Sequence, residues 1–210
     1  MKKIIFWTTL ISVVAFFIAA CAKKDDTATT VTAVTCDRTA SGSITIGSDT
    51  VSSSYLMETP NTPETGCYAM TSTGFPTGTQ SIKQQRIVTS STSFVDYTGY
   101  FSDTACTSTS VISYQYQKYS SLSVGDQVTG LTTSGGRPSS AYKVTYKTDC
   151  ATAKGETDAG TELLNYNYSN TGVYLTTGTE QTFSTETTGS IYNIWASGNS
   201  GSSFYDGSRS

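Results

Sequence analysis

Residues 112–117 read ISYQYQ, and residues 142–147 read YKVTYK. In both stretches bulky side chains alternate with polar ones, so that Ile112, Tyr114 and Tyr116 share one face while Ser and Gln share the other. Successive side chains of a β-strand point to opposite faces of a sheet, whereas a helix repeats every 3.6 residues. The two stretches therefore predict half-buried β-strands.

Shorter runs of similar character lie on both sides of these two stretches. We expect further strands at 44–46, 81–89, 93–101, 127–132, 161–168, 172–177 and 189–196. Clusters rich in Gly and Pro at 73–76 and 134–138, and a turn at 154–156, separate them. Eight or more short strands predict an all-β fold, an antiparallel meander that forms a single closed or nearly closed barrel of about eight strands. A β-sandwich is the alternative.

Residues Phe94 to Tyr119 resemble a lipocalin-type hairpin. The Gly-x-Trp signature of lipocalins is absent, and Trp195, the only Trp after the first 20 residues, lies near the other end of the chain. The resemblance implies a lipocalin-like topology and assigns no binding residue.

The composition excludes several classes of function. Thr and Ser supply 39 and 31 of the 210 residues, while strong helix formers are scarce, with seven Leu and six Glu. The chain has no His, which excludes a histidine base, metal ligand or pH switch. Acidic residues outnumber basic ones, 16 to 13, and no basic stripe is present, so we expect no nucleic-acid partner.

The amino terminus has the three-part layout of an export signal. A basic start at residues 1–3 precedes the apolar run Ile4 to Ala20, which ends in the tetrapeptide Ile18-Ala19-Ala20-Cys21. This tetrapeptide resembles the lipobox of bacterial lipoproteins. The resemblance implies cleavage before Cys21 and acylation of its thiol and its new amino terminus. A transmembrane helix or an ordinary secretory signal is the alternative.

The lipoprotein resemblance divides the chain into three parts: a signal peptide at 1–20, a lipidated amino terminus and flexible tether at 21–35, and a single β domain at 36–210. Ala22 follows the cysteine, where lipoproteins kept in the inner membrane often have Asp. In a bacterium with two membranes, this implies a lipid-anchored protein of the outer membrane that faces the periplasm or the cell surface.

Four cysteines follow the expected lipidation site, namely Cys36, Cys67, Cys106 and Cys150. An even number in an exported chain predicts two disulfide bonds, for which three connectivities exist. We favour the pairs that are neighbours in order, Cys36 with Cys67 and Cys106 with Cys150.

No motif in the chain points to catalysis. Residues 198–202 read GNSGS and miss the Gly-x-Ser-x-Gly pattern, and no histidine base accompanies them. Asp96 and Asp103, and the acidic stretch 149–162, lack the spacing of a glycosidase pair or of a calcium loop. We therefore expect no enzymatic activity, no cofactor and no metal.

Tyrosine is the one enrichment that suggests binding. Tyr114, Tyr116, Tyr142 and Tyr146 lie on the apolar faces of the two clearest strands, and we expect them to point inward as ligand-binding residues. Filling a half-buried sheet face is the simpler role for them. The leading hypothesis is a non-enzymatic cell-envelope lipoprotein that binds a partner protein or a small apolar ligand. A surface adhesion or structural interaction module is the alternative, and a hydrolase that works without histidine ranks third. An interior cavity would favour ligand carriage, and a solid core would favour interaction.

Overall fold

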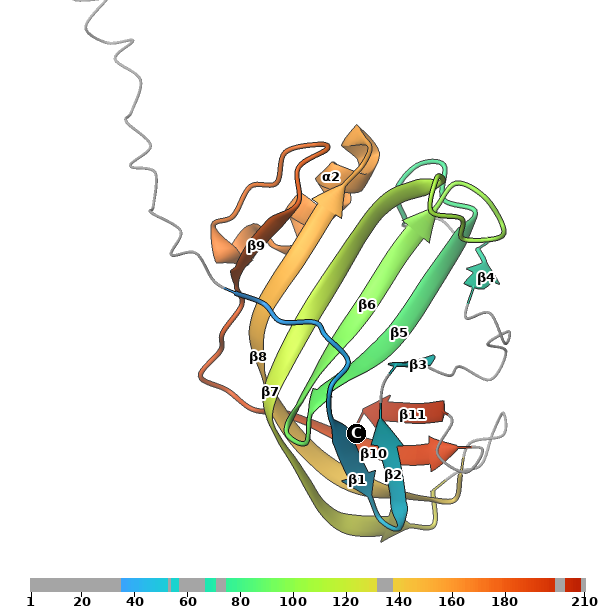
Figure 1. The fold of residues 1–210 in the computed structure, drawn as a ribbon, viewed down its shortest axis with the longest axis vertical. Helices are drawn as coiled ribbons and strands as arrows, with labels where there is room; N and C mark the ends of the chain where they lie inside the picture. Colours follow the sequence, from blue (N-terminus) through green and yellow to red (C-terminus); the bar gives the residue numbers. More distant parts are fainter. Residues whose placement is uncertain are drawn as a thin grey trace, which may run out of the picture. The chain divides into compact units, whose positions relative to one another are not determined.

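The computed structural model describes residues 35–52, 54–56, 67–70, 75–131, 138–198 and 203–208, all within the unit Thr32–Ser210. The strands are β1 (Ser43–Ile46), β2 (Asp49–Ser52), β3 (Ser54–Leu56), β4 (Cys67–Ala69), β5 (Ser81–Ser90), β6 (Ser93–Phe101), β7 (Val111–Thr129), β8 (Ser140–Gly155), β9 (Gln181–Ser184), β10 (Ile191–Gly198) and β11 (Ser203–Ser208) (Figure 1). The helices are α2 (Asp158–Asn167) and the single turn η2 (Ser169–Thr171). The predicted all-β class is confirmed, and the two most strongly alternating stretches lie in β7 and β8.

Nine strands form one antiparallel sheet in the order β11-β10-β8-β7-β6-β5-β3, with β4 also beside β5 and β9 also beside β8. The consecutive neighbours β5 to β8 are the predicted meander. Strands β1 and β2 form a separate hairpin. Among the described strands no ladder joins β11 to β3, so a closed barrel is not found. Two sheets that share a core fit the β-sandwich alternative.

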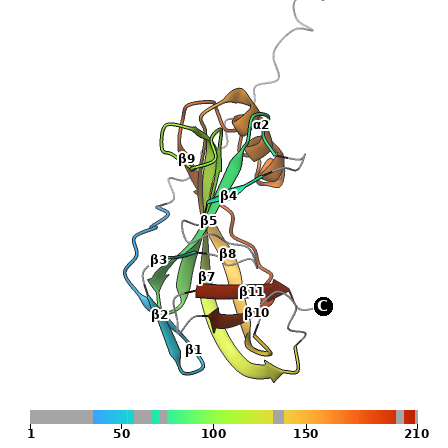
Figure 2. The same ribbon diagram turned by 90° about the vertical axis from the view of Figure 1, so that its right-hand side faces the viewer.

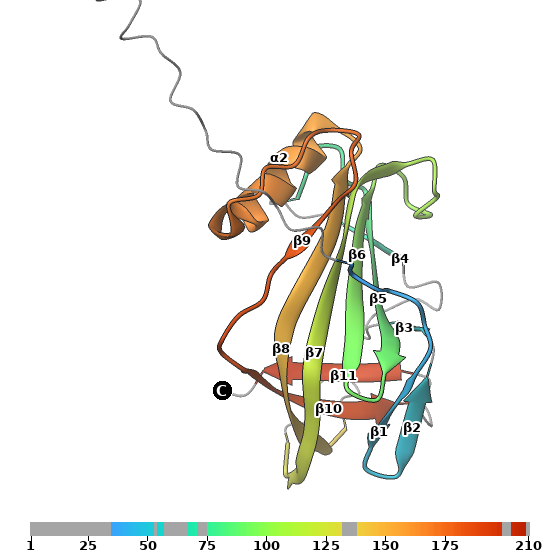
Figure 3. The same ribbon diagram turned by 60° about the vertical axis from the view of Figure 1, so that its left-hand side comes forward.

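Strands β7 and β8 are long because irregularities in their pairing bend them without interrupting the ladder. Their pairing shifts register at three places, between Gln117 and Tyr119, between Ser120 and Ser123, and between Val124 and Gln127. Each extra residue in a bulge bends the strand and increases its twist. The far ends of β7 and β8 therefore curl. Strand β10 pairs with this end of β8, β11 pairs with β10, and both run across the direction of the other strands (Figures 2 and 3). The separate strand expected at 127–132 is wrong, since residues 127–129 complete β7.

We call the concave side of the curled sheet, which carries Phe94 of β6 and Trp195 of β10, its inner face. Both side chains are fully buried. The Arg86 guanidinium lies between them, 4.4 Å from each ring centroid, and donates two hydrogen bonds of 2.8 Å to Asp96. The same core contains Ile44, Ile46, Val51, Val88, Leu122, Val144 and Tyr146. Side chains, including three from the β1–β2 hairpin, thus fill the inner face.

The strands expected at 161–168 and 172–177 are wrong. Residues 158–167 form α2, because the Thr157 side chain accepts a hydrogen bond from the Gly160 amide and caps the helix. Leu164 and Tyr168 face the sheet, while Tyr166 is 79% exposed, as a helical repeat requires. After the helix, the Leu175 backbone bonds to the side chain of Asn165 instead of joining a ladder.

Candidate functional site

The four tyrosines proposed from the sequence do not share one cavity. Tyr146 lies in the inner core and Tyr142 packs against that core. Tyr114 and Tyr116 lie on the opposite side of the sheet, which we call the outer face. The expectation that all four point inward is therefore wrong. The cause is the spacing along β7. Tyr116 pairs with Tyr97, whereas Tyr119, three residues further on, pairs with Phe94 and packs against the inner core; an odd spacing places two side chains of a strand on opposite faces.

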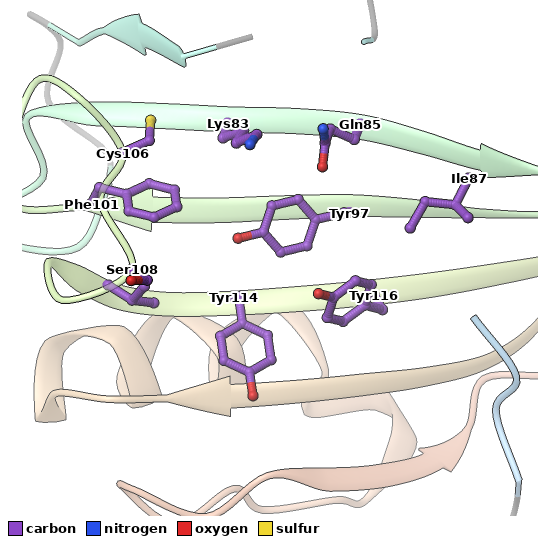
Figure 4. A pocket seen from close by; sticks show the side chains of 10 residues that line it. Lys83, Gln85, Ile87, Tyr97, Phe101, Cys106, Ser108, Tyr114 and Tyr116 are labelled. Atoms are coloured by element: carbon purple, nitrogen blue, oxygen red, sulfur yellow. The ribbon is translucent and has the colours of Figure 1, made fainter. Parts of the chain in front are cut away.

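A groove of about 350 Å³ runs over the outer face of β5, β6 and β7. Figure 4 shows Lys83 and Gln85 along one side, Tyr97 in the middle, and Tyr114 and Tyr116 along the other side. The complete lining consists of Lys83, Gln85, Ile87, Tyr97, Phe101, Cys106, Ser108, Val111, Tyr114 and Tyr116. Aromatic rings and a few polar groups thus share one concave surface, as is typical of sites for small ligands.

Tyr97 forms the floor of the groove because Gly99, two residues further along β6, has no side chain. A Cβ atom at Gly99 would lie 2.3 Å from the Tyr97 hydroxyl and 2.8 Å from a ring carbon of Phe101. The Tyr97 ring therefore lies lengthwise over the position that a side chain would fill. Burial, with a smaller contribution from the neighbouring Tyr116 hydroxyl, raises the pKa of Tyr97 to about 12.

The chain segment 36–42, which we call the strap, braces Tyr114 and Tyr116 at one end of the groove, although none of its own residues is in the lining. Its Arg38 guanidinium lies 4.5 Å above the Tyr116 ring and donates hydrogen bonds of 3.0 and 3.4 Å to Glu180. Glu180 also accepts a 2.5 Å hydrogen bond from the Tyr114 hydroxyl. These contacts fix both tyrosine rings against the strap. Figure 1 shows the strap passing in front of β8, β7 and β6 on its way to β1.

The strap contacts also change acid strengths at this end of the groove. Burial raises the pKa of Tyr114, and the hydrogen bond to the Glu180 carboxylate raises it further. Burial also acts to raise the pKa of Glu180, but the hydrogen bonds from Tyr114 and Arg38 outweigh it and hold that pKa below its ordinary value. Glu180 is therefore ionised at neutral pH and holds its two donors in place.

Three polar side chains of the lining, Lys83, Gln85 and Ser108, make no side-chain hydrogen bond or ion pair within the described ranges. The neighbouring cations are paired, Arg38 with Glu180 at 3.0 Å and Lys154 with Glu156 at 2.7 Å. Lys83 thus gives the groove a positive charge that no carboxylate of the described chain neutralises.

Both disulfide bonds are present, but the favoured pairing is wrong. Cys36 bonds to Cys150 and Cys67 bonds to Cys106, with Cα atoms 5.8 and 5.9 Å apart. The strap carries Cys36 across the sheet to β8, away from its neighbour in sequence. The second bond joins β4 to the loop 102–110, which forms the other end of the groove.

The acidic residues considered for catalysis have structural contacts. Asp96 binds Arg86 in the core. Hydrogen bonds, first from the Thr107 hydroxyl, lower the pKa of Asp103, which holds the turn 103–107. Asp158 accepts a hydrogen bond from Thr177. In the ranges the structure describes, no three Cys, Asp or Glu side chains gather in a group that fits a metal ion.

The groove was missed from the sequence, although part of its signal is readable. The β6 sequence SFVDYTGYF places Tyr97, Gly99 and Phe101 on one face, and the small residue between two aromatic ones indicates a ring that lies flat. Nothing in the sequence places Arg38 or Glu180 next to these strands. Cys21 and the run Ile4 to Ala20 lie outside the described residues; the described part contains no helix that is both long and apolar enough to cross a membrane.

Comparison with known proteins adds no assignment. No family model matches this chain, and no curated protein resembles it significantly.

Proposed function

We propose that this chain is a lipid-anchored protein of the bacterial cell envelope whose β domain, without catalysis, binds a small ligand or a partner through the outer-face groove. The observation that carries the proposal is the division of the two faces. The inner face is filled by side chains, and the outer face carries an aromatic groove whose polar groups have no partner among the described residues.

The packing of the inner face argues against carriage of a ligand inside the sheet. A nearly closed barrel remains part of the proposal, since β11 lies in contact with β3. Its interior, however, holds Trp195, Phe94 and the Arg86–Asp96 pair, and a ligand would have to displace them. Displacing the partner of a buried charge is costly, about 3–5 kcal/mol for a pair of this kind.

The outer groove, in contrast, is rigid before a ligand arrives. The Cys36–Cys150 bond fixes the strap, and Arg38 and Glu180 hold Tyr116 and Tyr114. A preformed site avoids part of the entropy cost of ordering side chains on binding. Its volume of about 350 Å³ lies at the lower end of the range for small-ligand sites.

The envelope location rests on residues 1–35 and on the two disulfide bonds. Such bonds persist in oxidising compartments, which include the periplasm and the cell surface. Acylation at Cys21 would attach the chain firmly to a membrane, because each buried methylene contributes about 0.8 kcal/mol. The tether 22–35 then reaches at most about 50 Å and leads into the strap.

The anchor is tested by metabolic labelling with an alkyne-tagged palmitate, followed by membrane fractionation in high salt. Wild type should label and stay with the membrane, whereas Cys21→Ser should do neither. A Lys23→Gln, Lys24→Gln variant is the control for attachment by charge and should behave as wild type. Retention of unlabelled Cys21→Ser in the membrane would contradict the lipoprotein assignment.

A surface adhesion or structural module is the second candidate. Tyr166 on α2 and Tyr174 in the following loop are 79% and 81% exposed, and aromatic residues are enriched in protein interfaces. If cells that display a Tyr166→Ser, Tyr174→Ser variant no longer adhere to a surface while cells that display Tyr97→Ala still do, the adhesion candidate replaces the groove.

A further inference from the structure

We propose that the outer-face groove binds a sugar ring that carries a carboxylate group. This inference rests on the proposed function and names the ligand class of the same groove. It follows from three features of the lining, which are a flat aromatic floor, polar groups that no described residue bonds, and one cation that no described carboxylate pairs.

The floor matches the apolar face of a pyranose. Sugar rings expose C–H groups on one side and bury them by stacking on flat aromatic rings, while a phenolic hydroxyl is placed to bond at the edge. Arg38 covers Tyr116 at 4.5 Å. Over Tyr97, in contrast, the described chain places no cation and no ring other than Tyr116, whose centroid is 4.9 Å away. Tyr97, lying over Gly99, is therefore the stacking platform.

The polar lining matches the edge of the same ring. Gln85 offers both a donor and an acceptor, and Ser108 offers a hydroxyl; neither is used by the described chain. These groups stand on either side of the floor, on β5 and on the loop before β7. A ring lying on Tyr97 would thus meet hydrogen-bonding groups at its rim, where its own hydroxyls point.

The charge of the groove selects an acidic sugar over a neutral one. Lys83 lines the groove without an ion pair to any described residue, and no Asp or Glu is among the lining residues. The two cations nearby are neutralised by Glu180 and Glu156. A carboxylate on the ligand would pair with Lys83, the one charged side chain of the groove lining, and a charged hydrogen bond is stronger than a neutral one.

The same features disfavour other ligands. A nucleic acid needs several clustered cations, whereas the whole chain carries a net charge of −3. An extended peptide commonly binds to the edge of a sheet through backbone hydrogen bonds. The groove instead lies on a face, over strands β5, β6 and β7, which pair with each other.

The test measures binding of matched sugars to the full-length protein by isothermal titration calorimetry. Glucuronic acid is compared with glucose, and N-acetylmuramic acid with N-acetylglucosamine, so that each pair contrasts an acidic sugar with a neutral one. The acidic member should bind about fivefold to tenfold more tightly. The better of the two acids identifies the source, exported polysaccharide for glucuronic acid and cell-wall glycan for N-acetylmuramic acid.

Two variants separate charge from stacking. Lys83→Gln should remove the preference for the acid and leave affinity for the neutral sugar unchanged. Gly99→Ala should weaken both sugars about tenfold, because the new Cβ would displace the Tyr97 ring from the floor. Lys143→Gln and Tyr174→Ala, which alter exposed residues outside the groove, are the controls and should bind as wild type. Tyr97→Ala removes the ring and leaves position 99 unchanged, so it should weaken both sugars as Gly99→Ala does, which separates loss of the platform from a fold defect; Tyr97→Phe keeps the ring and should retain stacking.

Three results would overturn the inference. These are equal affinity for both members of each pair, an acid preference that survives Lys83→Gln, and no binding of any sugar at a free concentration of about 10 mM, which would fill about nine-tenths of a site with a millimolar Kd. Binding of an apolar probe or a peptide that Gly99→Ala abolishes would also overturn it, yet would support the groove as the binding site. The proposed function fails separately, if ligands bind but Gly99→Ala and Tyr97→Ala bind them as wild type does.

Discussion

Replacement of Trp195 by Ala tests whether the inner face is filled. The side chain is fully buried, 4.9 Å from the Phe94 centroid and 4.4 Å from the Arg86 guanidinium. A buried Trp contributes roughly 200 Å² at about 25 cal/mol per Å², or about 5 kcal/mol, which is an upper value. Measured losses for Trp or Phe to Ala are about 3–5 kcal/mol. We expect the free energy of unfolding to fall by about 4 kcal/mol.

The assay is equilibrium unfolding in urea followed by circular dichroism, with disulfides intact. A fall in the midpoint with an unchanged slope reports lost stability without a change in the folded surface. Tyr174→Ala, at an exposed aromatic residue, is the matched control and should change stability by less than about 0.5 kcal/mol. Trp195→Phe should lose about 1–3 kcal/mol and keep a measurable folded state if the Ala variant does not fold. A loss below about 1 kcal/mol for Trp195→Ala would refute the filled interior.

Two further predictions follow from the disulfide bonds and from the raised tyrosine pKa. Non-reducing peptide mapping should find Cys36 linked to Cys150 and Cys67 linked to Cys106, and a peptide that links Cys36 to Cys67 would contradict the structure. Removing the Cys36–Cys150 bond should lower the free energy of unfolding by about 4.8 kcal/mol and removing the Cys67–Cys106 bond by about 3.9 kcal/mol, because the sequence separations are 114 and 39 and the longer loop loses more entropy on closure. Tyr97 has a pKa of about 12 in the folded protein and about 10 in the unfolded chain, so the unfolded chain loses the phenol proton first as the pH rises. The stability that the neutral phenol contributes is therefore complete below pH 10 and is lost as the pH rises to 12. Tyr97→Phe should lessen that alkaline loss in thermal melts between pH 9 and 12, and an unchanged pH profile would count against the burial of this phenol.

The sequence correctly predicts the strands in which apolar and polar side chains alternate with a single period. In residues 112–117 and 142–147, bulky side chains on one side of the strand pack against neighbouring side chains, while the other side is more polar. This arrangement produces a sequence pattern with a period of two residues. Ser81–Ser90 and Ser93–Phe101 were close to their predicted bounds for the same reason.

The failures occur where a distant contact decides the local structure. Residues 161–168 alternate over a few positions, yet Thr157 caps a helix whose Leu164 packs on Ala151 and Ala153 of β8. No local pattern reports that packing. Tyr114 and Tyr116 illustrate the same limit, since their partners across the ladder, Gly99 and Tyr97, lie on the face opposite to Phe94. Alternation within one strand does not show which of its two faces meets the core.

The groove depends on tertiary contacts more than any element does. Arg38 reaches Tyr116 only because the strap crosses the sheet, and the strap is fixed by a disulfide bond whose partner the sequence could not select. Glu180 comes from the loop before β9, 66 residues beyond Tyr114. The aromatic residues of the groove were visible as an enrichment, but their grouping on the outer face required the fold.

The most direct test of the outer-face site is a titration of the isotope-labelled full-length protein with glucuronic acid, followed by two-dimensional nitrogen–proton NMR. We expect shifts confined to the amides of the groove, among them Lys83, Gln85, Tyr97 and Ser108, with Gly99→Ala suppressing them. The indole N–H signal of Trp195, which reports the interior, should not move. Shifts at the Trp195 indole and the Phe94 amide, with the β5–β7 outer face unchanged, would contradict the outer-face site.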